Sequence, residues 1–137
     1  MMDLVKSMMI AASGLKAQGG RMRVIAENMA NAGSTAKTPD GEPYRRKIPT
    51  FASELDRAAG VERVKIGKIE RDTGAFGERY EPGHPAANEQ GYVKTSNVNT
   101  MIESIDMGQA QRGYEANLNV INTSRRMLNA TIDLLRR

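Results

Sequence analysis

The sequence contains no cysteine and no tryptophan, and His84 is the one histidine among its 137 residues. Without cysteine there is no disulfide framework, no thiolate nucleophile and no cysteine-ligated metal centre. A single histidine does not build a zinc site of the usual kinds. His84 lies in the tripeptide GHP, between Pro82 and Pro85. Because proline favours turns, we interpret His84 as a structural turn residue rather than a catalytic or pH-sensing one.

Aromatic residues are also scarce, at 4%, and hydrophobic residues amount to 39%, which is below the roughly 45–50% of ordinary globular chains. A large self-contained core is therefore not expected. The nine methionines are flexible side chains that adapt to irregular or shared surfaces, which suggests contacts with neighbouring chains. No apolar run approaches the ~18 residues of a membrane-spanning helix, so no membrane span is predicted.

Signals for catalysis and for nucleic-acid binding are missing too. Acidic pairs such as Glu54 and Asp56 lie in stretches of alternating charge, which is typical of solvated surfaces. The stretch GLKAQGG lacks the preceding strand and the lysine spacing of a phosphate-binding loop. The net charge of +4 is spread along the chain with acids interleaved, and few aromatics are available to stack on bases. We predict no enzyme, no cofactor, no metal, no small-molecule substrate and no nucleic-acid partner.

The N-terminal region has apolar residues at every seventh position. The main series is Met1, Met8, Leu15, Met22 and Met29, and its companion series is Leu4, Ala11, Gln18, Ile25 and Ala32. This period is typical of helices that pack along a shared seam, and it predicts a helix over residues 3–32. Gly14, Gly19 and Gly20 mark either a bend or the close approach of another segment. Gly33 is placed as a left-handed stop just after the helix.

The C-terminal region repeats the pattern. Its main series is Met107, Tyr114, Ile121, Leu128 and Leu135. The companion series contains Leu118 and Ile132 and is interrupted by Gln111 and Arg125. A second helix is predicted over about residues 99–136. At ~1.5 Å per residue the two helices are ~45 and ~55 Å long.

The region between the helices is rich in turn residues. Residues 34–43 predict a surface loop, 44–51 an extended segment and 53–60 a helical turn that ends at Gly60. Residues 61–72 alternate like a strand with a bulge, and a last short strand is expected at Tyr92 and Val93. The predicted fold is mainly α, with long terminal helices that pack as a coiled-coil-like pair and a turn-rich β insertion between them. The corresponding domains are 1–33, 34–97 and 98–137.

Asn28 and Asn31 lie among alanine and methionine near the end of the first predicted helix. Polar residues within an apolar seam fix the register and the partner at some cost in stability. The alternative is a surface helix terminus, where asparagine is tolerated. The sequence leaves these two interpretations open.

Residues 13–35, SGLKAQGGRMRVIAENMANAGST, resemble the N-terminal signature of the rod and hook proteins of the bacterial flagellum, whose Asn-X-Ala-Asn core falls on residues 28–31. Residues 91–136 are similar to the C-terminal rod motif. The matching residues there are Asn97-Val98-Asn99, Asp106-Met107 and Tyr114-Glu115-Ala116-Asn117. Residues 80–93 are most like the proximal rod family. Two departures are Ser96, where proline usually precedes Asn-Val-Asn, and IESIDM in place of a paired Glu-Met form.

The resemblance implies a non-catalytic rod subunit that is exported unfolded through the flagellar type III apparatus, without signal cleavage, into the periplasm-crossing rod. Such subunits polymerise through their terminal helices into a tube that transmits torque, with like and unlike rod proteins above and below. The residues expected at the assembly interface are Leu4, Met8, Leu15, Met22, Ile25, Asn28, Met29, Asn31, Asn97, Asn99, Met107, Tyr114, Asn117, Leu118, Ile121, Leu128, Ile132 and Leu135. The alternative function is a free-standing helical-hairpin dimer that binds other proteins.

Overall fold

The computed structural model describes the whole chain, residues 1–137. Its elements are helix α1 (Met2–Ala30), strands β1 (Lys47–Asp56), β2 (Val61–Arg71), β3 (Gly77–Tyr80) and β4 (Tyr92–Thr95), and helix α2 (Thr100–Leu135). Strands β1 and β2 form one two-stranded sheet, and β3 and β4 form another. The predicted fold class is confirmed, because two long terminal helices pack against each other with a small β module between them in the sequence.

The chain divides into two compact units, each of which contains part of both helices. The first unit is Met1–Met22, Thr50–Lys68 and Gly108–Arg137, and the second is Arg23–Pro49 and Ile69–Met107. The predicted domains 1–33, 34–97 and 98–137 follow the order along the chain instead, and they stay a prediction.

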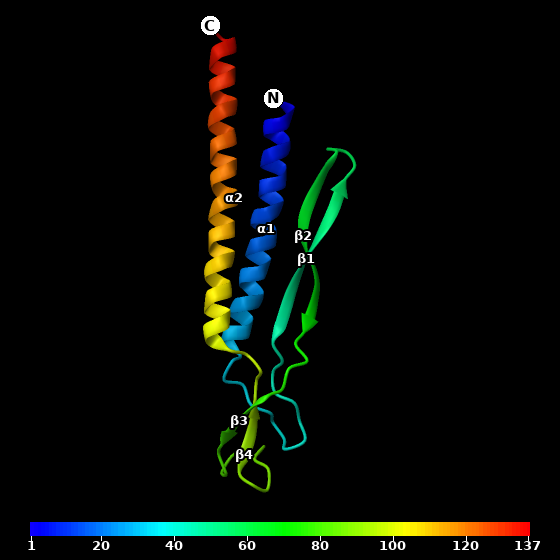
Figure 1. Cartoon of the computed structure of the whole chain (residues 1–137), viewed down its shortest axis with the longest axis vertical. Helices are drawn as coiled ribbons and strands as arrows, with labels where there is room; N and C mark the ends of the chain where they lie inside the picture. The colour runs from blue at the N-terminus through cyan, green and yellow to red at the C-terminus, as the bar shows by residue number, and fades with distance from the viewer. The chain divides into compact units, whose positions relative to one another are not determined.

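In the first unit, α1 and α2 run side by side in opposite directions (Figure 1). Glycines on each helix receive an amide side chain from the other. A Cβ atom added to Gly14 would lie 2.6 Å from Asn117 Nδ2, and one added to Gly113 would lie 2.8 Å from Gln18 Nε2. The two glycines are therefore sites of close helix approach, which is one of the two predicted roles for Gly14.

The β1–β2 hairpin lies beside α1 in the same unit (Figure 1). The backbone N–H of Val64 donates a 3.2 Å hydrogen bond to Ser13 Oγ. A Cβ atom on Gly20 would meet Ile66 Cγ1 at 2.9 Å, whereas one on Gly19 would meet nothing within 4 Å. Gly20 thus lets the hairpin approach the helix.

The predicted helical turn over residues 53–60 is wrong. Residues 53–56 belong to β1, and residues 57–60 form the hairpin turn. Asp56 Oδ1 accepts hydrogen bonds from the N–H groups of Ala58 and Ala59, at 3.0 and 3.1 Å. Gly60 adopts φ +64°, a left-handed conformation that glycine reaches without steric cost. The segment is therefore the end of a strand followed by a hairpin turn.

Helix α2 buries small or polar side chains along one line, at a spacing of seven residues. Glu103, Ala110 and Ser124 are buried and Asn117 is half-buried. Met107, Ile121 and Leu128 of the predicted seam each lie four residues after a member of this line, so they flank it on the helix surface. All three are half-buried. Small residues in the contact allow two backbones to approach closely, as the glycines at 14 and 113 also do.

The β3–β4 sheet of the second unit is antiparallel, with Gly77 opposite Thr95 and Tyr80 opposite Tyr92. Residues 34–36 add to its edge, since Ala36 N donates to Lys94 O at 3.4 Å and Ser96 N donates to Ser34 O at 3.1 Å. The small core of this unit consists of Ala36, Ala86 and Val93. Ser96 also donates its hydroxyl to Ala32 O at 2.7 Å. A proline at position 96 could not donate the backbone bond.

The helix ends are closed by asparagine side chains. Asn31 Nδ2 donates to Glu27 O at 2.8 Å, a carbonyl that also accepts the backbone N–H of Asn31 at 3.1 Å. The prediction that Gly33 is a left-handed stop is wrong, because only Gly60 and Gly91 have positive φ. At the start of α2, Asn99 Oδ1 accepts from Met101 N at 3.0 Å and from Ile102 N at 3.3 Å, as an N-cap residue does.

Candidate functional site: the helix junction and the exposed apolar face

The predicted interface residues differ widely in exposure. Ile25 and Asn28 are buried within the chain. Leu4, Met8, Leu15, Met22, Asn31, Asn97, Met107, Asn117, Ile121 and Leu128 are half-buried, and Met29, Asn99, Tyr114, Leu118, Ile132 and Leu135 are exposed. The exposed and half-buried members are available to a neighbouring chain, and their place at an assembly interface stays a prediction.

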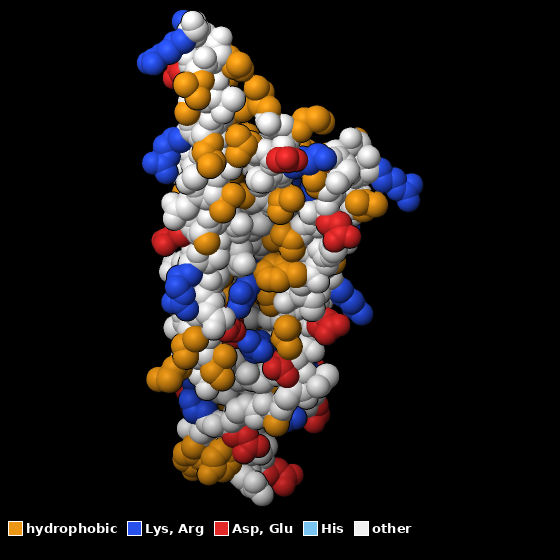
Figure 2. Space-filling view, turned by 45° about the horizontal axis from the view of Figure 1, so that its top comes forward, with side chains coloured by type: hydrophobic (Ala, Val, Ile, Leu, Met, Phe, Trp, Pro, Cys, Tyr) orange, Lys and Arg blue, Asp and Glu red, His pale blue; other side chains and the backbone are white.

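Large apolar side chains cover much of the outward surface of α2. The exposed ones are Met101, Ile102, Ile105, Tyr114, Leu118, Val120, Met127, Ile132, Leu134 and Leu135. Figure 2 shows hydrophobic side chains at the surface of the visible face, between lysines and arginines. Val120, Met127 and Leu134 are 44%, 53% and 73% exposed and lie seven residues apart, so they form a line along the helix that the chain itself leaves uncovered.

Asn28 lies at the centre of a polar cluster in the second unit. It is 1% exposed, and its amide makes four hydrogen bonds. Nδ2 donates to Lys47 O at 2.8 Å and to Glu103 Oε2 at 3.2 Å, and Oδ1 accepts from Tyr44 Oη at 2.8 Å and from Lys47 N at 2.9 Å. Two donors and two acceptors are the full capacity of an asparagine side chain. Asn28 therefore joins segments of its own chain.

Glu103 is the second buried member of this cluster, at 1% exposed. Its Oε1 accepts a hydrogen bond from Arg46 Nε, which is also an ion pair. Burying a carboxylate is costly unless it is paired and hydrogen-bonded, and here Arg46 and Asn28 supply both. The first turns of α2 and the last turns of α1 thus meet through residues of the 44–47 segment.

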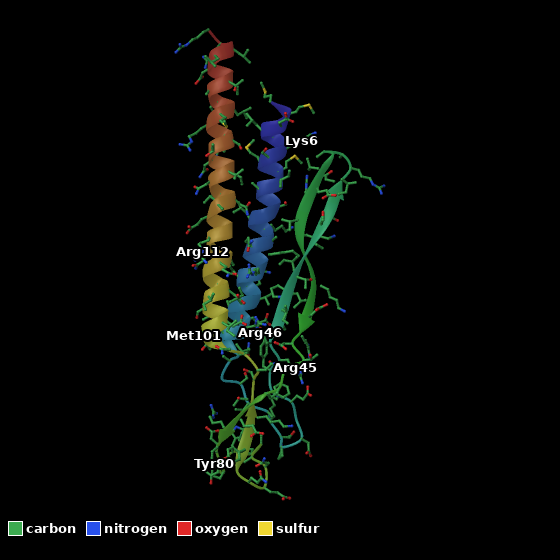
Figure 3. The ribbon with its side chains drawn as sticks, viewed as in Figure 1. Lys6, Arg45, Arg46, Tyr80, Met101 and Arg112 are labelled. Atoms are coloured by element: carbon green, nitrogen blue, oxygen red, sulfur yellow. The ribbon has the colours of Figure 1, made fainter.

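Arg46 has three acidic neighbours (its position is labelled in Figure 3). Besides Glu103, its guanidinium lies 3.6 Å from Asp72 and 3.4 Å from Asp106. Burial by itself would lower the pKa of Arg46, but the hydrogen bond and charge of Glu103, with Asp106 and Asp72, raise it above the usual value. The guanidinium therefore stays charged.

The backbone around Arg46 is tied down as well. Arg46 N donates to Asn97 Oδ1 at 2.7 Å, and Asp72 N donates to Arg46 O at 2.8 Å. We call the set of Asn28, Tyr44, Arg46, Lys47, Asp72, Asn97, Glu103 and Asp106 the junction cluster.

Burial of Tyr44, followed by the charges of Glu27 and Glu103, raises the pKa of the Tyr44 hydroxyl.

Sequence reasoning found Asn28 and Asn97 but missed Tyr44, Arg46 and Glu103. Periodicity favours apolar positions, and a charged residue inside a buried contact interrupts the pattern rather than marking it. The available signal was the departure IESIDM, which contains both Glu103 and Asp106.

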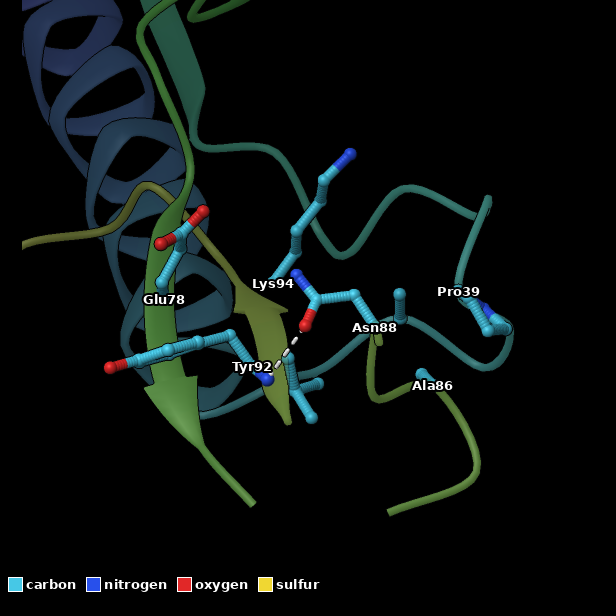
Figure 4. A pocket seen from close by; sticks show the side chains of 8 residues that line it. Pro39, Glu78, Ala86, Asn88, Tyr92 and Lys94 are labelled. Carbon is cyan, nitrogen blue, oxygen red and sulfur yellow. Dashed lines mark hydrogen bonds between the residues drawn. The ribbon is translucent and has the colours of Figure 1, made fainter. Parts of the chain in front are cut away.

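A small hollow beside the β3–β4 sheet has a volume of about 30 Å³ (Figure 4). Its lining includes Glu78, Lys94 and Asn88. The Asn88 side chain is already used in the turn, because Oδ1 accepts from Gln90 N and from Tyr92 N, at 3.0 and 2.9 Å. The hollow shows no convergence of catalytic groups.

His84 sits near this hollow and holds a turn. Its Nδ1 accepts a 3.0 Å hydrogen bond from Ala86 N, and its Nε2 lies 3.2 Å from Thr35 Oγ1. Both ring nitrogens are thus engaged within the fold, as expected of a structural turn histidine. No group of His, Asp and Glu side chains is arranged to hold a metal ion.

Neither helix has a stretch long and apolar enough to cross a membrane. Two paired helices, a polar junction and an uncovered apolar face define a structural protein of the kind that assembles with other chains.

Comparison with known proteins specifies the class. Residues 89–134 match the family described as flagellar basal body rod FlgEFG protein C-terminal. The chain is 54% identical to the flagellar basal-body rod protein FlgC of Agrobacterium fabrum, over 93% of this chain and 91% of that protein. It is 38% identical to FlgC of Borreliella burgdorferi, over 98% and 99% of the two chains. Against FlgC of Bacillus subtilis the identity is 34%, over 97% and 99%.

The chain belongs to the FlgC family of flagellar basal-body rod proteins. This is the proximal rod family that the sequence motifs indicated. Its members are structural components of the rod in the flagellar basal body, which agrees with the expectation that the chain is not an enzyme.

Proposed function

We propose that this chain polymerises through its terminal helices as a subunit of the proximal rod, within the periplasm-crossing shaft that transmits torque. The observation that carries this proposal is the uncovered apolar surface of α2. Isolated soluble proteins seldom leave so many large apolar side chains of one helix in water. Neighbouring helices are the partners that a line of apolar residues with a spacing of seven suits best.

The energy available from this surface is substantial. Fully burying an exposed Val, Leu, Ile or Met side chain contributes ~1.5–3 kcal/mol. Val120, Met127 and Leu134 are 44%, 53% and 73% exposed in the single chain, so each would contribute a corresponding part of this energy. Lateral packing of α2 against helices of other subunits would bury this line. The half-buried residues of the predicted interface, such as Ile121 and Leu128, would then be shut away from water.

The partners in this proposal are copies of the chain and unlike rod proteins above and below it, and the flagellar type III apparatus is the export route. A proximal subunit contacts different proteins at its two ends. Exposed methionines on both helices, including Met29, Met101 and Met127, suit such unlike contacts because their side chains adapt their shape.

A free-standing helical-hairpin dimer is the second candidate, because the same surface could be covered by one partner. Analytical ultracentrifugation over a range of concentrations separates the two. An open-ended series of species, or a monomer that polymerises on rod seeds, supports the rod subunit. A single dimer that does not grow with concentration supports the free-standing module.

The proposal is tested by the variant Met127→Glu, which puts a charge in the middle of the exposed line. Because Met127 is 53% exposed, thermal unfolding of the single chain should change little, whereas polymerisation and motility should be lost. Asn122→Glu is the matched control, since Asn122 is also exposed on α2 and its spacing places it on a different side of the helix. Normal motility of Met127→Glu cells would refute the proposed use of this surface.

A further inference from the structure

We propose that Arg46 is the positioning residue that holds the end of α1 and the start of α2 together, so that the helix junction depends on the docking of segment 44–47. This inference concerns the single subunit and goes beyond the assembly proposed above. Arg46 acts through Glu103.

The first step of the argument is the burial of Glu103. Its carboxylate is 1% exposed, like the amide of Asn28. Glu103 lies in the first turn of α2, where the positive end of the helix dipole favours a carboxylate only modestly. Burying a charge costs considerably more than the dipole returns, so most of this cost must be offset by a cation from elsewhere. That cation is Arg46, which pairs with Glu103 Oε1, while Asn28 Nδ2 reaches Oε2 at 3.2 Å.

The second step is that Arg46 is delivered by a segment tied to both helices. Lys47 exchanges two backbone hydrogen bonds with the Asn28 side chain, at 2.8 and 2.9 Å. Arg46 N donates to Asn97 Oδ1 at 2.7 Å, just before α2 begins. A short segment therefore joins α1, the approach to α2 and α2 itself. Loss of one contact should loosen the others, because buried polar networks are cooperative.

The third step is that three carboxylates surround the single guanidinium of Arg46. Asp72 and Asp106 lie 3.6 and 3.4 Å from its guanidinium, in addition to Glu103. Substituting Arg46 would remove the shared cation from among three carboxylates. Lysine would restore a charge but not the planar fork that reaches several acids at once. The geometry thus distinguishes a guanidinium from a simple positive charge.

The test is hydrogen exchange with mass spectrometry on the full-length subunit, under conditions where it is monomeric. Arg46→Met should raise exchange by about tenfold or more, together, in peptides covering residues 24–31 and 100–107, because local protection follows local stability. Peptides covering β3 and β4 should keep their protection, which shows that the variant still folds. Arg46→Lys should be intermediate.

Two further variants separate this role from general destabilisation. Glu103→Met should loosen the same two segments, but Arg46→Met with Glu103→Met should exchange more slowly than Arg46→Met alone, since no buried carboxylate is then left without its cation. Arg79→Gln is the control, because Arg79 forms an exposed 3.1 Å ion pair with Glu81 in the same unit. This change should leave residues 24–31 and 100–107 unaffected.

The proposal is overturned if Arg46→Met changes exchange only around residues 44–47. It is also overturned if the loss of protection in the double variant, over residues 24–31 and 100–107, equals the summed losses of the two single variants. Both results are read on the monomer. They are therefore independent of whether the chain polymerises, and failure of the assembly proposal would leave this test intact.

Discussion

Asn28 Nδ2 donates a 3.2 Å hydrogen bond to Glu103 Oε2 across 75 residues of sequence. Both side chains are 1% exposed. The bond brings the last turns of α1 to the first turns of α2, although neither residue belongs to an apolar pattern. Residue 28 thus connects parts of one chain, which gives its asparagine a use that does not require a neighbouring subunit.

Replacing Asn28 by alanine should lower the free energy of unfolding by about 2–4 kcal/mol. Four hydrogen bonds are lost, and the Glu103 and Lys47 groups are left partly unpaired in a buried place, where each unpaired group costs ~1–3 kcal/mol. Urea unfolding of the monomer measures this change. Asn129→Ala, at an exposed position of α2, should shift the midpoint little. A loss below about 0.5 kcal/mol for Asn28→Ala would contradict the central place of this residue.

Replacing glycine by alanine should lower the stability of the chain at Gly14 and Gly113 and raise it at Gly19. Gly14→Ala should destabilise by about 1–3 kcal/mol, because a Cβ atom there meets Asn117 Nδ2 at 2.6 Å. Gly113→Ala should cost less, since its Cβ meets the flexible end of Gln18. Thermal unfolding of the purified subunit checks both.

Gly19→Ala is the matched control for these glycines. Nothing lies within 4 Å of its added Cβ, and alanine is favoured over glycine inside a helix by ~1 kcal/mol. The expected result is a small gain in stability. Equal losses at positions 14 and 19 would mean that the contact with Asn117 does not limit the helix spacing.

The Tyr44 hydroxyl should make stability fall at alkaline pH. Burial, with Glu27 and Glu103, raises the pKa of Tyr44 above its ordinary 10.0, so folding favours the neutral phenol. The corresponding stability is fully present below pH 10 and is lost as pH rises through the raised pKa. Urea unfolding of the wild type and of Tyr44→Phe between pH 8 and pH 11 tests this. The wild-type advantage should shrink with pH, and a constant difference would show that ionisation of Tyr44 is not linked to folding.

His84 should matter through its two hydrogen bonds. Asparagine can keep the acceptor for Ala86 N but loses the contact with Thr35 Oγ1, and leucine loses both. Stability should therefore fall in the order His84, His84→Asn, His84→Leu, by about 1 kcal/mol per bond. Motility at neutral pH should be retained in His84→Asn. Loss of motility in that variant with unchanged unfolding would instead indicate a chemical role for the ring.

Leu128→Asp should stop assembly without stopping export. Leu128 is half-buried in the single chain, and a charge buried there by a neighbouring subunit would have no partner, which is costly. Under the proposed export route, through which the chain passes unfolded, packing at this position does not affect export. Fractionation should find the variant outside the cytoplasm of non-motile cells, and the exposed change Arg137→Gln should be mild. Normal rods, or retention in the cytoplasm, would contradict this prediction.

The two terminal helices and the family could be inferred from the sequence. Apolar residues repeated every seven positions over both ends, and this period depends only on local helix geometry. The flagellar rod motifs lie on the same segments. Strand β2 and the short strand β4 were also predictable, because alternation and turn residues are local signals as well. Tertiary contacts were not needed for any of these elements.

The tertiary structure decided which side of each helix is buried, and what it is buried against. The line inside the helix pair carries Ala110, Asn117 and Ser124 rather than the leucines of the predicted seam. Gly14 and Gly113 let the helices approach so closely that small side chains fill the contact. Arg46 and Glu103 pair across 57 residues, because a buried charge is stable only beside a partner that folding brings to it. Sequence period specifies a helix, whereas the pairing of distant polar groups exists only once the chain has folded.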